Sequence, residues 1–182
     1  MGRFRPSHSI FSHYNNGDIY NFLTNGGHSA VIIRYKIRKK IKGKKKIGSG
    51  ARRLVYDLGN GTVIKIAKPK GGIRSNKKEF VVYKSSTYKI KKHLGKIKKH
   101  GRRYDWLIMK KYSKKFPKSK KYKRKLYKLK KLFKKNGVIP YEIMRRRTGK
   151  PNFQNLRLNK KGKIIVIDYG NFKFIRNNRL SS

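Results

Sequence analysis

Apolar and polar residues alternate along several short stretches of the chain. Every second residue over 31–37 is apolar, and the basic residues Arg34 and Lys36 lie between them. This alternation predicts a half-buried strand over 29–38. A continuous apolar run begins at Trp106, and it predicts a buried strand over 104–109.

Two hairpins are predicted from strand pairs that flank turn residues. The first joins strands over 54–58 and 62–67 through Gly59-Asn60-Gly61, whose residue types tolerate the positive φ of a tight turn. The second joins strands over 156–158 and 163–170 near the end of the chain.

A first helix is predicted after the strand over 62–67. Ser75 is a suitable N-cap residue for a helix over 76–92. Glu79, Phe80 and Tyr83 then share one helical face, because they lie at three- and four-residue spacings.

The clearest helical period occurs over 119–135. Its apolar residues recur at intervals of four, three and four positions: Tyr122, Leu126, Leu129 and Phe133. Asn136-Gly137 predicts the end of this helix. Its other faces consist almost entirely of lysine and arginine, which would be left exposed.

The net charge of the chain adds an expectation about its binding partner. The 182 residues include 54 lysines and arginines against six acidic residues, a formal net charge of +48. The apolar fraction of 36% allows a modest core in one domain, or in one domain with an arm. We therefore expect contact with a polyanion. The alternative is compositional drift from AT-rich coding, in which part of the lysine excess is solvated surface.

Features that the chain lacks exclude several kinds of site and favour an intracellular location. Zero cysteines exclude disulfides, thiolate zinc sites and cysteine nucleophiles. The longest aliphatic run, 164–167, is too short for a membrane helix, and the first residues lack the apolar region of a signal peptide. We expect a basic arm over 1–28 and an intracellular location, in the host cytoplasm or nucleoid, or in a virion, since the composition is typical of phage or other viral genes.

Several residue types that handle phosphate occur in a characteristic order. They are Gly48-Ser49-Gly50, Lys65, Glu79, Asn155 and Asp168, the last in Asp168-Tyr169-Gly170. This order resembles the protein kinase-like superfamily. The resemblance implies that Gly48, Ser49, Gly50, Lys65 and Glu79 bind a nucleotide, with Glu79 as the ion-pair partner of Lys65. It also implies that Asn155 and Asp168 hold a metal, so ATP and Mg²⁺ are the expected cofactors.

The chain also departs from the pattern of that superfamily. Arg53 replaces the third glycine of the loop, and Lys150 stands five residues before Asn155, where the family has its catalytic aspartate. A charged lysine does not accept the proton of a substrate hydroxyl, and the nearest preceding acid is Glu142. Only twelve residues follow Gly170. We therefore expect little or no phosphorylation of peptides.

The resemblance also implies an α+β fold in two lobes. A kinase-like N-lobe with an antiparallel sheet and one helix is expected over 29–113. A truncated, mainly helical C-lobe over 114–182 would contain the basic helix and end in a β-hairpin.

Two functions from different classes stay open. In the first, a catalytically impaired kinase-like protein binds nucleic acid or another polyanion, within a viral or nucleoprotein assembly that includes other proteins. In the second, the chain is an active, atypical Mg-ATP-dependent phosphotransferase. The residues expected to contact the polyanion are all basic: Lys120, Lys123, Arg124, Lys128, Lys131, Arg145, Arg146 and Arg147.

Overall fold

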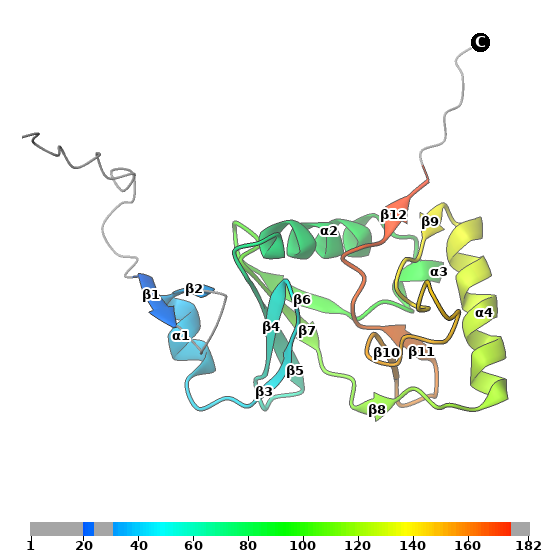
Figure 1. The fold of residues 1–182 in the computed structure, drawn as a ribbon, viewed down its shortest axis with the longest axis horizontal. Coiled ribbons are helices and arrows are strands. Elements are labelled where there is room, and N and C mark those ends of the chain that lie inside the picture. Colours follow the sequence, from blue (N-terminus) through cyan, green and yellow to red (C-terminus); the bar gives the residue numbers. More distant parts are fainter. Residues whose placement is uncertain (1–19, 24–30, 176–182) are drawn as a thin grey trace, which may run out of the picture.

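The computed structural model describes residues 20–23 and 31–175, which form an α+β fold as the sequence predicts (Figure 1). Most of the predicted arm over 1–28 lies outside the described residues. Its described part is strand β1 (Tyr20–Leu23), which pairs antiparallel with β2 (Val31–Arg34).

A five-stranded antiparallel sheet forms the centre of the first half of the chain. Its strands are, in spatial order, β3 (Lys46–Ser49), β4 (Arg53–Asp57), β5 (Thr62–Ala67), β7 (Trp106–Lys110) and β6 (Ile97–His100). β4 and β5 form the predicted hairpin, whose turn contains Gly59 and Gly61 with positive φ. All six residues of β5 are buried. Its alternate side chains therefore serve both faces of the sheet.

Helix α1 (Tyr35–Ile41) corrects the prediction of a strand over 29–38. The strand ends at Arg34, and the chain turns into a helix in which Ile37 and Ile41 lie one turn apart. Both pack against Ile64 and Ile66 of β5, on one face of the sheet. The burial of this pair outweighs the local alternation of apolar residues.

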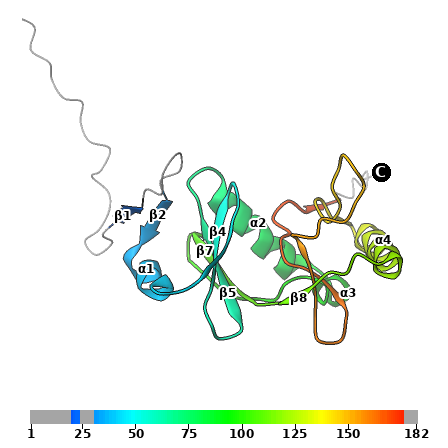
Figure 2. The same cartoon turned by 60° about the horizontal axis from the view of Figure 1, so that its bottom comes forward.

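Helix α2 (Gly72–Ser85) covers the other face of the sheet, and Figure 2 shows α1 and α2 on opposite sides of it. α2 does not begin as predicted. Ser75 is not its cap, because the helix starts at Gly72 after Gly71, which has a φ of 76°. A Cβ on Gly72 would lie 2.8 Å from the Cα of Ala67. The absence of a side chain thus allows the helix to begin almost directly after β5.

The predicted helix over 76–92 is divided in two. Ser86 has extended backbone, with ψ of 141°, and its hydroxyl donates to the carbonyl of Val82. A separate short helix, α3 (Tyr88–Lys91), follows. α3 contributes the fully buried Ile90 to the core.

The second half of the chain is built around α4 (Lys120–Lys135), which confirms the predicted helix. The Ser119 side chain accepts a hydrogen bond from the Tyr122 amide and caps the helix. A three-stranded sheet in this half consists of β11 (Ile164–Val166), β10 (Leu156–Leu158) and β8 (Lys114–Lys115), and a two-stranded sheet consists of β12 (Lys173–Phe174) and β9 (Val138–Ile139). β10 and β11 form the predicted hairpin, and β12 follows it in the chain.

One apolar core continues from the main sheet into the second half. It includes Val63 of β5, Val82 of α2, Leu126 of α4 and Val166 of β11. The amide of Val166 donates to the carbonyl of His93, and the amide of Gly95 donates to the carbonyl of Val166. These contacts tie β11 to the segment between α3 and β6. Among the described residues, no helix is long and apolar enough to cross a membrane.

Candidate functional site

A cavity of about 330 Å³ lies between the β3–β4 turn and the segment after β11. Gly50, Arg53, Lys65 and Asp168 line it, together with Glu142. Arg52 also lines the cavity, so three cations and two carboxylates, from parts of the chain that are distant in sequence, meet in one hollow.

The predicted ion pair between Lys65 and Glu79 is present in the structure. Nζ of Lys65 lies 2.9 Å and 3.0 Å from the two carboxylate oxygens of Glu79, and it also donates to the carbonyl of Ile167 at 2.6 Å. Glu79 is 0% exposed and Lys65 is 6% exposed. Burial lowers the pKa of Lys65 below its ordinary value, and attraction to Glu79 offsets only part of this effect.

Arg53 joins this pair to Asp168. Its Nη1 lies 2.6 Å from Glu79, and its Nη2 forms an ion pair with Asp168. Burial would lower the pKa of Arg53, but the carboxylates of Glu79 and Asp168 outweigh it and raise the pKa. Burial would likewise raise the pKa of Asp168, but Lys65 and Arg53 hold it below its ordinary value. Two cations and two carboxylates thus form one connected network.

The segment that carries Asp168 is fixed against α2. The amide of Tyr169 donates to Glu79 at 3.0 Å, and its hydroxyl donates to the carbonyl of Gly95 at 2.7 Å. A Cβ on Gly170 would lie 2.7 Å from Oγ and 2.9 Å from the carbonyl oxygen of Ser75. Only glycine permits this approach, so Asp168 has a defined position beside the network.

The predicted loop Gly48-Ser49-Gly50 lies partly in a strand: Gly48 and Ser49 end β3, and Gly50 begins the turn to β4. Gly48 pairs with Val55 across the hairpin, and the amide of Gly50 donates to the carbonyl of Arg53 at 2.9 Å. Ser49 accepts a weak hydrogen bond from Lys68 at 3.3 Å. Of these three residues, Gly50 lines the cavity.

Asn155 lies near the network but is turned towards another group. Its carbonyl accepts from the amide of Ile167 at 2.9 Å, which places it beside the segment before Asp168. Its side-chain amide donates to the carbonyl of Glu142 at 3.1 Å.

This arrangement does not fit a Mg²⁺ ion held by Asn155 and Asp168. Magnesium needs a near-octahedral set of oxygen ligands, whereas one of the two carboxylate oxygens of Asp168 accepts from the guanidinium of Arg53, and the side-chain amide of Asn155 donates to the carbonyl of Glu142. Within the described residues, no three histidine, aspartate or glutamate side chains are grouped so as to hold a metal ion. A divalent cation at Asp168 would therefore lie beside the positive charge of Arg53.

Lys150 and Glu142, the two residues considered for proton transfer, lie in different places. Lys150 lies in an exposed loop, where its carbonyl accepts from the amide of Arg145 at 2.8 Å, and it is not among the residues that line the cavity. Glu142 does line the cavity, and its φ of 63° is uncommon for a residue with a side chain. The acid that lies thirteen positions before Asn155 in the sequence thus reaches the site.

The predicted polyanion contacts lie on two exposed segments. The first is α4, in which ten of sixteen residues are lysine or arginine and Leu126, Leu129 and Phe133 are buried. The exposed cations on it include Lys120, Lys123, Arg124, Lys128 and Lys131. The second is the turn between Met144 and Pro151, where Arg145, Arg146 and Arg147 are all exposed.

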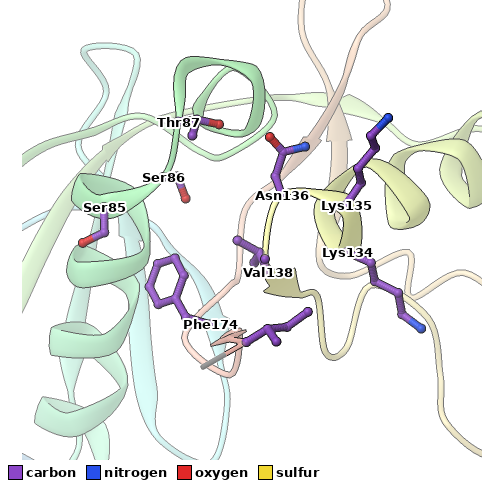
Figure 3. A pocket seen from close by; sticks show the side chains of 10 residues that line it. Ser85, Ser86, Thr87, Lys134, Lys135, Asn136, Val138 and Phe174 are labelled. Carbon is purple, nitrogen blue, oxygen red and sulfur yellow. The ribbon is translucent and has the colours of Figure 1, made fainter. Parts of the chain in front are cut away.

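A larger cavity, of about 450 Å³, lies where the ends of α2 and α4 meet β12 (Figure 3). Ser85, Ser86, Lys134, Asn136 and Phe174 are among its lining residues. None of the described residues around it is acidic, and none belongs to the predicted nucleotide or metal set. The smaller cavity, which holds the buried charges, is therefore the candidate site.

No family model matches this chain, and no curated protein is similar to it in sequence. The candidate site is therefore assigned from the geometry of its own residues.

Arg53 is the residue whose contribution the sequence alone did not show. Its signal was its replacement of a glycine and its place in β4, two residues before Val55, which packs against the core on the α2 side of the sheet. Because strand side chains alternate, Arg53 and Val55 point to the same face. That face contains Lys65, which pairs with Val55 in the sheet.

Proposed function

We propose that this protein is a kinase-like nucleotide-binding protein, impaired in phosphoryl transfer, whose cationic exterior holds a nucleic acid or another polyanion. One observation supports the nucleotide site above all: Lys65, held by Glu79, lines the same cavity as Asp168 and Gly50. These residues come from distant parts of the sequence, in the order that the kinase resemblance predicts. A cavity of about 330 Å³ is within the size range of small-molecule sites.

The charges around the cavity suit a phosphate group. Lys65 lines the cavity, and both oxygens of Glu79 and the carbonyl of Ile167 hold its ammonium group in a fixed position. A fixed ammonium group attracts phosphate without reorganising on binding. Gly50 and Ala51 also line the cavity, and their small size leaves room beside the lysine.

Impaired transfer follows from the same geometry. Lys150 lies outside the cavity, and Arg53 engages Asp168. The presence of Glu142 at the cavity favours the second candidate, an active atypical phosphotransferase. Its carboxylate could accept a proton from an acceptor hydroxyl there.

The nucleotide site is tested by measuring ATP binding by calorimetry in high salt, which weakens contacts with the exposed lysines. Wild-type protein should bind ATP, and Lys65→Met should weaken binding at least about tenfold through the loss of one fixed cation. Lys70→Met, which removes an exposed lysine after β5, is the control. Equal binding by wild type and Lys65→Met would contradict the proposal.

Transfer is measured separately with labelled ATP and a basic acceptor protein. A turnover well below the ~1 per second of ordinary kinases is expected. Turnover at that rate, abolished by Glu142→Gln, would instead establish the active candidate.

The polyanion proposal rests on the exposed face of α4. Along it, Lys120, Arg124, Lys128 and Lys131 lie four, four and three positions apart, and no acidic residue lies in the first turn of the helix. Like charges one turn apart destabilise a helix, and cations near its N-terminus oppose the helix dipole. Phosphates along this face would relieve both effects.

Charge reversal tests this face. Replacing Lys123, Lys128 and Lys131 with glutamate should weaken binding to DNA and RNA and lower the salt slope by roughly 0.7–0.9 log units for each lost phosphate contact. The control reverses three exposed lysines of α2: Lys77, Lys78 and Lys84. An equal loss in both variants would indicate diffuse attraction and would exclude α4 as the binding face.

A further inference from the structure

Arg53 places a positive charge directly beside Asp168, the carboxylate that the kinase resemblance assigns to a divalent cation. We propose that the cavity binds a nucleoside triphosphate without a divalent cation, because Arg53 supplies the positive charge from within the chain. This inference rests on the proposed nucleotide site and adds the form in which the nucleotide binds.

The charges of the network are the first reason to expect binding without a divalent cation. Arg53 and Lys65 contribute two positive charges, and Glu79 and Asp168 contribute two negative charges, joined by ion pairs. Arg52 and Glu142 also line the cavity and add one charge of each sign, so a phosphate group that approaches the cavity meets charges that sum to zero. Without Arg53 the same network would carry one negative charge, and a cation would be needed to offset the repulsion.

The position of Arg53 is the second reason to expect binding without a divalent cation. Its residue is 7% exposed, and its guanidinium contacts two carboxylates, of which Glu79 is fully buried. The guanidinium holds one of the two carboxylate oxygens of Asp168, so an ion that binds this side chain lies beside a fixed positive charge and is repelled by it. Magnesium also gives up its water reluctantly, which adds to the cost of binding there.

The experiment compares ATP binding in excess Mg²⁺ and in EDTA, in high salt, for wild type and Arg53→Met. The methionine keeps an unbranched, apolar side chain in β4 and removes the charge. Binding that is lost in Lys65→Met counts as binding in the cavity. Arg103→Met, in the exposed turn between β6 and β7, is the control for loss of one positive charge.

Wild type and Arg103→Met should bind ATP with affinities that agree within about threefold in the two buffers. Arg53→Met should bind at least about tenfold more weakly in EDTA, and Mg²⁺ should restore much of the loss. Arg53→Lys, which keeps the charge, should stay independent of metal; it provides a second measurement if the methionine variant does not fold.

Three results would overturn the inference. Wild-type binding that requires Mg²⁺ would refute it and leave the nucleotide site standing. Binding by Arg53→Met but not by wild type would show that Arg53 closes the cavity. Absence of binding to wild type in both buffers would refute the nucleotide site as well.

Discussion

Replacing Glu79 with glutamine removes the charge at the centre of the network and nearly preserves its volume. In the wild type, the Glu79 carboxylate accepts from Lys65, Arg53 and the amide of Tyr169. A glutamine amide offers one accepting oxygen, and its NH₂ group would face cations that only donate.

The expected cost is large because the lost charge lies in the interior. Glu79 is 0% exposed and Lys65 is 6% exposed, so the two cations would stay buried, with Asp168 paired to Arg53 and, among the described residues, only the carbonyl of Ile167 bound to Lys65. Removing one partner of a buried ion pair typically costs about 3–5 kcal/mol. With a urea m-value of roughly 2 kcal/mol/M, the unfolding midpoint should fall by about 2 M.

Urea denaturation followed by tryptophan fluorescence measures this change. The control is Glu142→Gln, since it changes the net charge equally but removes an exposed carboxylate, with an expected effect within about 0.5 kcal/mol. Adding Lys65→Met to Glu79→Gln should recover part of the loss, because it removes one of the uncompensated cations. A loss below about 1 kcal/mol for Glu79→Gln would refute the reasoning, because that is the value of an exposed pair.

Two further predictions concern His93 and Gly170. Burial lowers the pKa of His93 in the folded state, so the unfolded chain binds the proton first as the pH falls below about 6.5. The free energy of unfolding should then decline as the pH falls, by less than the limit of about 1.4 kcal/mol per pH unit, because solvent screens this half-buried ring. Urea denaturation across this pH range should show no such decline from position 93 in His93→Gln. Gly170→Ala should cost about 1–3 kcal/mol, because a Cβ would lie 2.9 Å from the carbonyl oxygen of Ser75; a midpoint equal to that of wild type would contradict the packing described.

The elements that the sequence predicted well depend on local patterns. α4 begins one residue after its predicted first residue, Ser119, which is its cap, and it ends at Lys135, because one apolar stripe at helical spacing has one face to bury. The hairpin between β4 and β5 was equally clear, since Gly59 and Gly61 both adopt positive φ.

Where the prediction was wrong, a tertiary contact decided the local structure. The alternation over 31–37 is typical of a strand, yet Ile37 and Ile41 are spaced for a helix and reach the face of β5 that carries Ile64. The start of α2 depends on the close approach of Gly72 to Ala67, which residue type alone does not reveal.

In the candidate site, too, the local contact was predictable from the sequence and the long-range contacts were not. The Lys65–Glu79 pair spans 14 positions and follows from a strand and the next helix, so motif order was enough to predict it. Arg53 meets Asp168 across 115 positions, and that contact depends on how the second half packs against the first. Glu142 likewise reaches the cavity through a backbone conformation that the sequence does not specify.

The pairing of three carboxylates with cations of the same chain has a consequence for how copies of this protein meet. Asp57, Glu79 and Asp168 are already bound to lysine or arginine of the same chain, so they offer little to the cations of a neighbouring molecule. Two copies therefore repel each other at distances up to roughly 10 Å in 0.1 M salt. A nucleic acid strand between them would reverse this repulsion, so clustering of copies should follow the ratio of phosphate to protein rather than the protein concentration.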